Sequence, residues 1–117
     1  PDLAPRDQRL LERLAEWLEA HSGNSDIEIQ AMAEDVHLTP RTLQRKLKSL
    51  TGRTPAAYLR EYRLARARRL LLSSDDSVTD IAHACGFSSS QYLSRTFRDE
   101  HGAPPEKWRQ DRSAAEA

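Results

Sequence analysis

The sequence contains an internal repeat, and this repeat limits the fold more than any other feature of the chain. Apolar, glycine and proline positions in the first half recur 49 residues later before a turn, and 50 residues later after it. The matched pairs are Met32 and Ile81, Ala33 and Ala82, Leu38 and Phe87, Leu43 and Leu93, Leu47 and Phe97, Gly52 and Gly102, Pro55 and Pro105, and Tyr58 and Trp108. Each copy has the pattern of a short helix, a tight turn, a capped helix and a glycine stop, which indicates a helix-turn-helix motif.

Helical periodicity extends over the rest of the chain, and no segment alternates as a half-buried strand would. We expect helices over residues 7–21, 29–36 and 54–72, from Thr39 to Gly52, from Ser77 to Cys85, from Ser88 or Ser89 to Gly102, and from Pro104 onward. The predicted fold class is therefore all-α, with about seven helices arranged as two helix-turn-helix lobes joined by a long central helix.

The central helix is the longest uninterrupted segment of the prediction. Thr54 is a suitable N-cap, Pro55 occupies the first helical position, and neither glycine nor a further proline follows before Ser73. At ~1.5 Å per residue, an unbroken helix from here to Leu72 would be about 27 Å long. The predicted organisation is an N-terminal helix with the first lobe over 1–53, the connecting helix over 54–72, the second lobe over 73–112, and a disordered tail over 113–117.

The formal net charge is zero, but the charges are strongly separated along the chain. Residues 1–38 carry a balance of −6, residues 39–72 a balance of +9, and residues 73–117 a balance of −3. A basic middle segment favours a polyanionic partner. The central helix contributes five arginines to it. Because they surround the helix, we expect about half of them to contact phosphates of such a partner or to form intramolecular ion pairs, and the rest to be solvated. The five arginines are Arg60, Arg63, Arg66, Arg68 and Arg69.

The second helix of each copy is predicted to expose polar side chains opposite its buried apolar stripe. In the first copy these are Arg41, Gln44, Arg45 and Lys48, and in the second copy they are Gln91, Ser94, Arg95 and Arg98. Arginine offers a two-pronged donor to the guanine edge, and glutamine pairs in the same way with adenine. A helix presenting such a face fits the major groove, so the sequence predicts binding to double-stranded DNA.

Two segments resemble the DNA-binding domain of AraC/XylS-type transcription regulators, over about residues 8–110. They are LTPRTLQRKLKSLTGRTPAAYLREYRLARARRLLL and VTDIAHACGFSSSQYLSRTFRDEHGAPPEKWR. The resemblance implies two recognition helices that enter adjacent major grooves on one face of the DNA. It places Arg41, Gln44 and Arg45 at base-facing positions of the first recognition helix, and Ser90, Gln91, Ser94 and Arg95 at those of the second. The sequence departs from the family at Glu28, where a Ser or Thr helix cap is usual.

The resemblance also implies partners outside this chain. Family members carry a separate sensory or receiver domain, and the segment LKSLTGRTPAAYLREYRLARARRLL is similar to output domains fused to two-component sensors or response regulators. We therefore expect an N-terminal sensory or receiver domain that is missing here, contact with RNA polymerase, and a bacterial transcription activator in the cytoplasm. The only methionine is Met32, so we expect a fragment of a longer protein. No apolar run approaches the roughly 20 residues of a membrane span.

Other classes of function have weaker support in the residues. The four histidines are scattered without cysteine partners, so neither a metal site nor a cofactor is expected; they are His21, His37, His83 and His101. The single Cys85 is predicted to pack inside a lobe, and no catalytic constellation is present, so we do not expect an enzyme. Two alternatives remain open: a helical protein-interaction module without DNA binding, and the DNA-contacting part of a repair enzyme.

Overall fold

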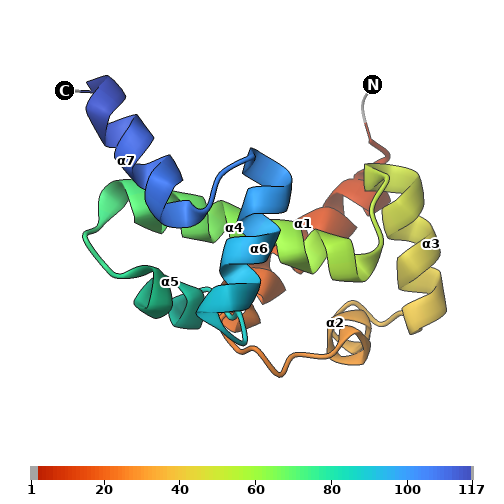
Figure 1. Ribbon diagram of the computed structural model, residues 1–117. Helices are drawn as coiled ribbons and strands as arrows, with labels where there is room; N and C mark the ends of the chain where they lie inside the picture. The colour runs from red at the N-terminus through yellow and green to blue at the C-terminus, as the bar shows by residue number, and fades with distance from the viewer. Residues whose placement is uncertain (1–2, 117) are drawn as a thin grey trace. The chain divides into compact units, whose positions relative to one another are not determined.

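The computed structural model describes residues 3–116, which form seven α-helices and no strand (Figure 1). The helices are α1 (Pro5–His21), α2 (Ile29–Asp35), α3 (Pro40–Thr51), α4 (Pro55–Ser73), α5 (Val78–Ala84), α6 (Ser90–His101) and α7 (Pro105–Glu116). The all-α prediction is confirmed. No helix in the described part of the chain combines the length and the apolar content that crossing a bilayer requires.

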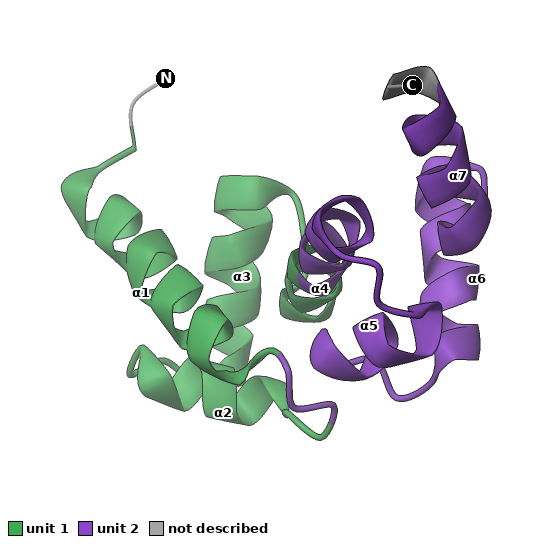
Figure 2. Ribbon diagram, turned by 90° about the vertical axis from the view of Figure 1, so that its left-hand side faces the viewer, with its two compact units in different colours: residues 1–22, 26–62 green, residues 23–25, 63–117 purple. Residues whose placement is uncertain are grey.

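The chain divides into two compact units, and the division lies inside α4 (Figure 2). Unit 1 comprises residues 1–22 and 26–62, and unit 2 comprises residues 23–25 and 63–117. Each unit buries one part of α4: Leu59 belongs to the core of unit 1, whereas Leu64 and Leu71 belong to the core of unit 2. The helix predicted at 54–72 to connect the lobes thus contributes side chains to the core of both units.

The core of unit 1 joins α1, α2, α3 and the first turns of α4. Its buried residues are Leu14, Trp17, Leu18, Met32, Ala33, Leu43, Leu47 and Leu59. Helix α1 supplies three of them, Leu14, Trp17 and Leu18, because helical spacing turns these side chains to one side. A hydrogen bond from the Tyr62 hydroxyl to the Glu19 carboxylate also links α4 to α1.

The core of unit 2 is formed by the rest of α4 with α5, α6 and α7. Its buried residues are Leu64, Ala67, Leu71, Ile81, Ala82, Cys85, Phe87, Leu93, Phe97 and Trp108. The rings of Phe97 and Trp108 meet edge to face with their centroids 5.3 Å apart. Arg109 of α7 donates from Nε to the Leu71 carbonyl at 3.0 Å and from Nη2 to the Ser74 carbonyl at 3.3 Å. It therefore satisfies carbonyl groups at the C-terminal end of α4, which have no partner within the helix.

The two helix-turn-helix turns are closed by equivalent hydrogen bonds. The Leu38 N–H donates to the Ala33 carbonyl, and the Phe87 N–H donates to the Ala82 carbonyl, each at 2.9 Å. The residue just before each donor has a left-handed backbone: φ is 59° at His37 and 87° at Gly86. The additional residue of the second copy lies immediately after this turn, before the cap of α6.

The start of α2 has no side-chain cap, and α7 ends later than the sequence predicted. Glu28 is the N-cap of α2 and makes no side-chain capping bond, which agrees with the departure noted in the sequence. Helix α7 continues to Glu116, so residues 113–116 are helical where the sequence predicted a disordered tail, and residue 117 lies outside the described residues. This segment contains neither glycine nor proline and includes alanines, which have the highest helix propensity.

Candidate nucleic-acid interface

Helix α3 is fixed at both ends by local signals. The Thr42 N–H donates to the Thr39 side chain at 3.1 Å, which caps the N-terminus, and proline follows the cap. At the other end Gly52 takes a left-handed backbone with φ of 78°, which glycine adopts without steric cost. Leu43 and Leu47 are completely buried in unit 1. The buried pair and the two caps together determine which face of α3 is exposed.

The predicted reading residues of α3 come together on that exposed face. Arg41, Gln44, Arg45 and Lys48 are all exposed, and with Thr42, Ser49 and Thr54 they line an open hollow of about 720 Å³. Three of the four carry positive charge, so the face suits an anionic partner. Lys48 also makes a hydrogen bond that the sequence did not predict: its Nζ donates to the Gly52 carbonyl at 3.1 Å, beyond the last turn of the helix. A basic side chain in the last turn is the signal for such a contact.

Helix α6 repeats this construction in unit 2. The Tyr92 N–H donates to the Ser89 side chain at 3.0 Å, Gly102 has φ of 78°, and Leu93 and Phe97 are completely buried. The predicted reading residues separate into two groups. Gln91, Arg95 and Arg98 are exposed, whereas Ser90 and Ser94 are half-buried. We expect the exposed group to reach further into a groove than the two serines.

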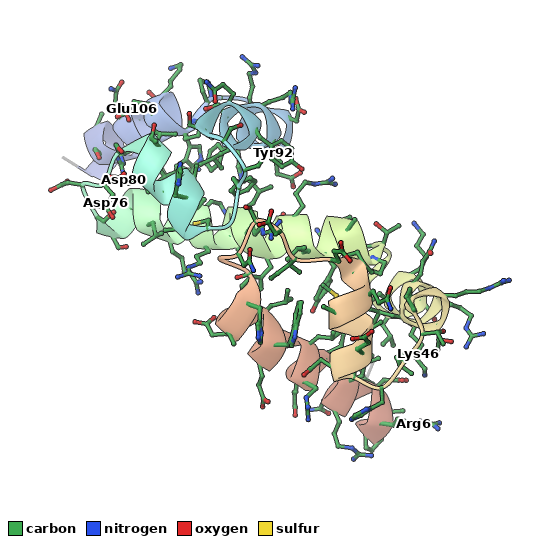
Figure 3. All side chains as sticks on the ribbon, turned by 90° about the horizontal axis from the view of Figure 1, so that it is seen from below. Arg6, Lys46, Asp76, Asp80, Tyr92 and Glu106 are labelled. Carbon is green, nitrogen blue, oxygen red and sulfur yellow. The ribbon has the colours of Figure 1, made fainter. Side chains whose placement is uncertain are left out.

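Tyr92 is a functional candidate that the sequence analysis missed. It lies on α6 (Figure 3), one turn before Arg95, and the Arg95 guanidinium carbon lies 5.8 Å from the centroid of its ring. The same ring also meets the ring of Phe87 edge to face, with the centroids 5.6 Å apart. An arginine over an aromatic face is attracted by the ring electrons. The spacing of three residues between tyrosine and arginine is the signal that could have indicated this pair. The first copy has Thr42 in place of the tyrosine.

The arginines of α4 differ in their surroundings. The Arg63 Nη2 donates to the Asn24 carbonyl at 2.8 Å, and its partial burial lowers the pKa of the guanidinium. Arg68 donates from Nη1 to Nε2 of His101 at 3.0 Å. Arg60 and Arg69 are exposed. Arg66 is half-buried. Two of the five arginines thus make hydrogen bonds within unit 2, and the two exposed arginines are the candidates for phosphate contacts.

The titratable residues form no candidate metal site in the described range. No group of three or more His, Cys, Asp or Glu side chains is placed to hold a metal ion among residues 3–116. Cys85 is fully buried, and this burial raises the pKa of its thiol. Cys85 therefore packs within unit 2 as a small apolar residue, as predicted.

Comparison with known proteins gives a consistent result at the level of sequence. A family model described as a helix-turn-helix domain matches residues 32–111. The HTH-type transcriptional activator RhaS of Escherichia fergusonii is 47% identical over 105 residues, which cover 90% of this chain and 37% of that protein. The chain therefore spans well under half the length of this curated relative.

Solved structures agree in fold as well as in sequence. The DNA-binding domain of AdpA, a global transcriptional factor, in complex with a target DNA has a TM-score of 0.83 and 33% identity, covering 91% of this chain and 94% of that one. A transcriptional regulator from Chromobacterium violaceum, described among AraC-type DNA-binding domain-containing proteins, has a TM-score of 0.81 and 32% identity, covering 93% and 96%. Both similarities extend over nearly the whole chain, so they include both helix-turn-helix copies.

Proposed function

Since this chain belongs to the AraC-type helix-turn-helix family of DNA-binding transcription regulators, we propose that α3 and α6 are its two recognition helices. The observation that carries the proposal is the equivalence of the two helices. Each has twelve residues, a side-chain cap at its start, a left-handed glycine at its end, and a fully buried pair that turns an arginine- and glutamine-bearing face outward. The family consists of transcription regulators, which are not enzymes.

We assign base contacts to one exposed arginine and one exposed glutamine of each face. Arg45 and Arg95 donate to guanine edges, and Gln44 and Gln91 pair with adenine edges. Arg41 and Arg98 lie one turn away and contact either bases or phosphates. Lys48 supplies charge beside the groove, because its bond to the Gly52 carbonyl holds it toward the C-terminal end of α3. Ser90 and Ser94 are half-buried and contribute shorter contacts.

The two helices are proposed to read neighbouring segments of one duplex. Motifs of this kind contact major-groove segments about 10–10.5 bp apart, roughly 34 Å centre to centre. The presence of two equivalent motifs in a single chain supports a site with two halves. A protein-interaction surface, by contrast, is depleted of charge at its centre, which the arginine-bearing faces of α3 and α6 are not.

The larger protein is proposed to be a cytoplasmic transcription activator of a bacterium. In it, this domain would follow an N-terminal sensory or receiver domain and act on RNA polymerase. Support comes from the similarity to RhaS, which is described as a transcriptional activator. The matched region covers only 37% of RhaS, which supports the proposal of a further domain.

The proposed function is tested by selecting duplexes from a random pool and footprinting the selected site. We expect two protected major-groove segments about 10–10.5 bp apart. Arg45→Ala and Arg95→Ala should each cost about 1–3 kcal/mol on the selected site and relax the preference at one base position. Arg69→Ala is the matched control on α4, and it should weaken all duplexes about equally, with a shallower salt dependence, or have no effect.

Two results would contradict the assignment. Protection of one groove segment alone would mean that only one helix reads DNA. If Arg45→Ala and Arg95→Ala lost equal affinity on selected and scrambled duplexes, these arginines would be phosphate contacts, and base recognition would belong to other residues.

A further inference from the structure

The N-terminal part of the chain concentrates its few basic residues in one place. The first 38 residues hold nine acidic and only three basic side chains. All three basic residues, Arg6, Arg9 and Arg13, line a single hollow in unit 1, which we call the α1 hollow. Their spacing of three and four residues places them on one side of α1. Lys46 of α3 is a fourth cation at the same hollow, and Figure 3 shows it at the same end of unit 1 as Arg6.

The α1 hollow also has an apolar lining. Leu10, Val36 and Leu38 line it, and each remains half-buried at the edge of the unit 1 core. Its volume is about 270 Å³, below the ~300–1,000 Å³ that is common for small-molecule sites. The hollow is therefore of a size to accept an apolar side chain rather than a complete drug-sized ligand.

The charges at the rim leave a positive surplus. Lys46 lies 3.7 Å from the Asp7 carboxylate, and Arg13 lies 3.1 Å from the Asp35 carboxylate, so each of these cations has a partner. Arg6 and Arg9 are exposed and form no ion pair with any residue that the structure describes. Two unneutralised arginines beside an apolar hollow complement carboxylates that flank an apolar group.

His37 also lines the α1 hollow, and it does so with an unusual backbone. It is the only residue other than glycine with a positive φ in the described part of the chain, whereas the second copy has Gly86 at the equivalent position. A side chain in this conformation is sterically disfavoured. The imidazole of His37 therefore forms part of the wall of the α1 hollow, whereas the second copy has no side chain at the equivalent position.

We propose that the α1 hollow docks an acidic peptide segment of a partner protein. One apolar side chain of the segment fills the hollow, and carboxylates beside it pair with Arg6 and Arg9. The site lies off the DNA-reading face, because at about 100° per residue Lys46 points about 100° away from Arg45 and about 160° away from Gln44. The apolar lining also favours a peptide over a phosphate backbone, which offers nothing to fill it.

The test uses nitrogen-15-labelled 117-residue chain and the probe peptide acetyl-Asp-Glu-Leu-Phe-Glu-Asp-amide. Titration followed by NMR should shift the amide signals of α1 and of the turn after α2 in a saturable manner, and leave α6 unchanged. The double variant Arg6→Ala/Arg9→Ala should weaken binding about fivefold or more. Replacing the Leu-Phe pair of the probe by Ser-Ser should weaken it about tenfold or more, because the apolar anchor is lost.

The matched control is the double variant Arg53→Ala/Arg60→Ala, which removes the same charge from exposed positions of unit 1 outside the hollow. It should bind the probe like the parent chain. A second variant, His37→Gly, removes a side chain that lines the hollow. It should bind the probe more weakly because the apolar anchor loses part of its contact surface, while its melting temperature rises, so the weaker binding cannot come from loss of the fold.

Three outcomes would overturn the proposal. The first is equal weakening by both double variants, which would mean attraction by general charge. The second is absence of any saturable shift around the α1 hollow with the folded chain. The third is a pair of results with a scrambled DNA duplex: the duplex shifts the same amide signals, and Arg6→Ala/Arg9→Ala binds it more weakly. Those results would make this surface a phosphate contact. None of these outcomes bears on the base contacts proposed for Arg45 and Arg95, so the two proposals fail independently.

Discussion

Replacing Tyr92 by leucine should weaken cognate DNA binding through its effect on Arg95. The Arg95 guanidinium carbon lies 5.8 Å from the ring centroid, near the outer limit of about 6 Å for a useful cation–π contact. The arginine is exposed, so the contact is worth about 0.5–1 kcal/mol. If the ring holds the guanidinium in place before DNA arrives, its loss should reduce affinity about two- to fivefold.

The magnitude is measured as a coupling energy in a double-mutant cycle. Arg95→Ala alone should cost about 1–3 kcal/mol. In that background Tyr92→Leu should cost little more, which gives a coupling energy of about 0.5–1 kcal/mol. Tyr92→Phe keeps the ring and should bind nearly as the parent chain does. Because Tyr92 is half-buried, thermal unfolding of each variant must show that the chain is folded at the temperature of the assay.

The first copy supplies the control, since Thr42 occupies the equivalent position and cannot hold Arg45 in this way. A cycle between Thr42→Leu and Arg45→Ala should give no coupling. Affinities are measured on the cognate duplex and on one altered at the base that Arg95 contacts. The reasoning is refuted if Tyr92→Phe and Tyr92→Leu behave alike, if the coupling with Arg95 is zero, or if Tyr92→Leu loses the same affinity on both duplexes.

Three further predictions concern stability and reactivity. His37→Gly should raise the free energy of unfolding by about 1 kcal/mol, because it relieves a left-handed backbone; an unchanged or lower value in chemical denaturation would contradict this. Leu64→Pro should cost about 3 kcal/mol or more by breaking α4, and full helicity by circular dichroism would show that the helix does not pass continuously through this residue. Burial raises the pKa of the Cys85 thiol, so a thiol reagent at neutral pH should react with it only after unfolding; since the folded state disfavours the thiolate, this group's stabilisation is lost as the pH rises above the ordinary thiol pKa. Rapid labelling of the folded chain would contradict that placement.

The features that sequence could predict are those controlled by neighbouring residues. Thr39 was recognisable as a cap, and Gly52 and Gly102 as stops, because each acts within a few residues of its own position. The cap of α6 was narrowed to Ser88 or Ser89, and the structure shows that it is Ser89. The same locality allowed the exposed faces of α3 and α6 to be deduced from the buried pairs. The base-contact residues remain a prediction.

The features that sequence missed depend on residues far apart in the chain. The contact between Arg63 and Asn24 joins positions 39 apart, and nothing near either residue indicates it. The division of the chain inside α4 was also missed. Two separate cores share this helix, so its apolar residues do not form a single stripe from which the boundary could be predicted. The α1 hollow was missed for a similar reason. Arginines on an acidic helix are usually solvated, and the sequence does not show that Lys46 of α3 lies at the same hollow.

Helices α3 and α6 are anchored in the same way, independently of the residues that they expose. Each is held by a hydroxyl at its start, a left-handed glycine with φ of 78° at its end, and a buried pair four residues apart, and none of these belongs to the exposed face. Selection can therefore alter the exposed residues of one copy without disturbing how that helix is anchored. A duplication of this motif would leave one copy free to change its preferred bases while the other kept the ancestral ones, so that a lengthened target sequence arises by divergence of surface residues alone.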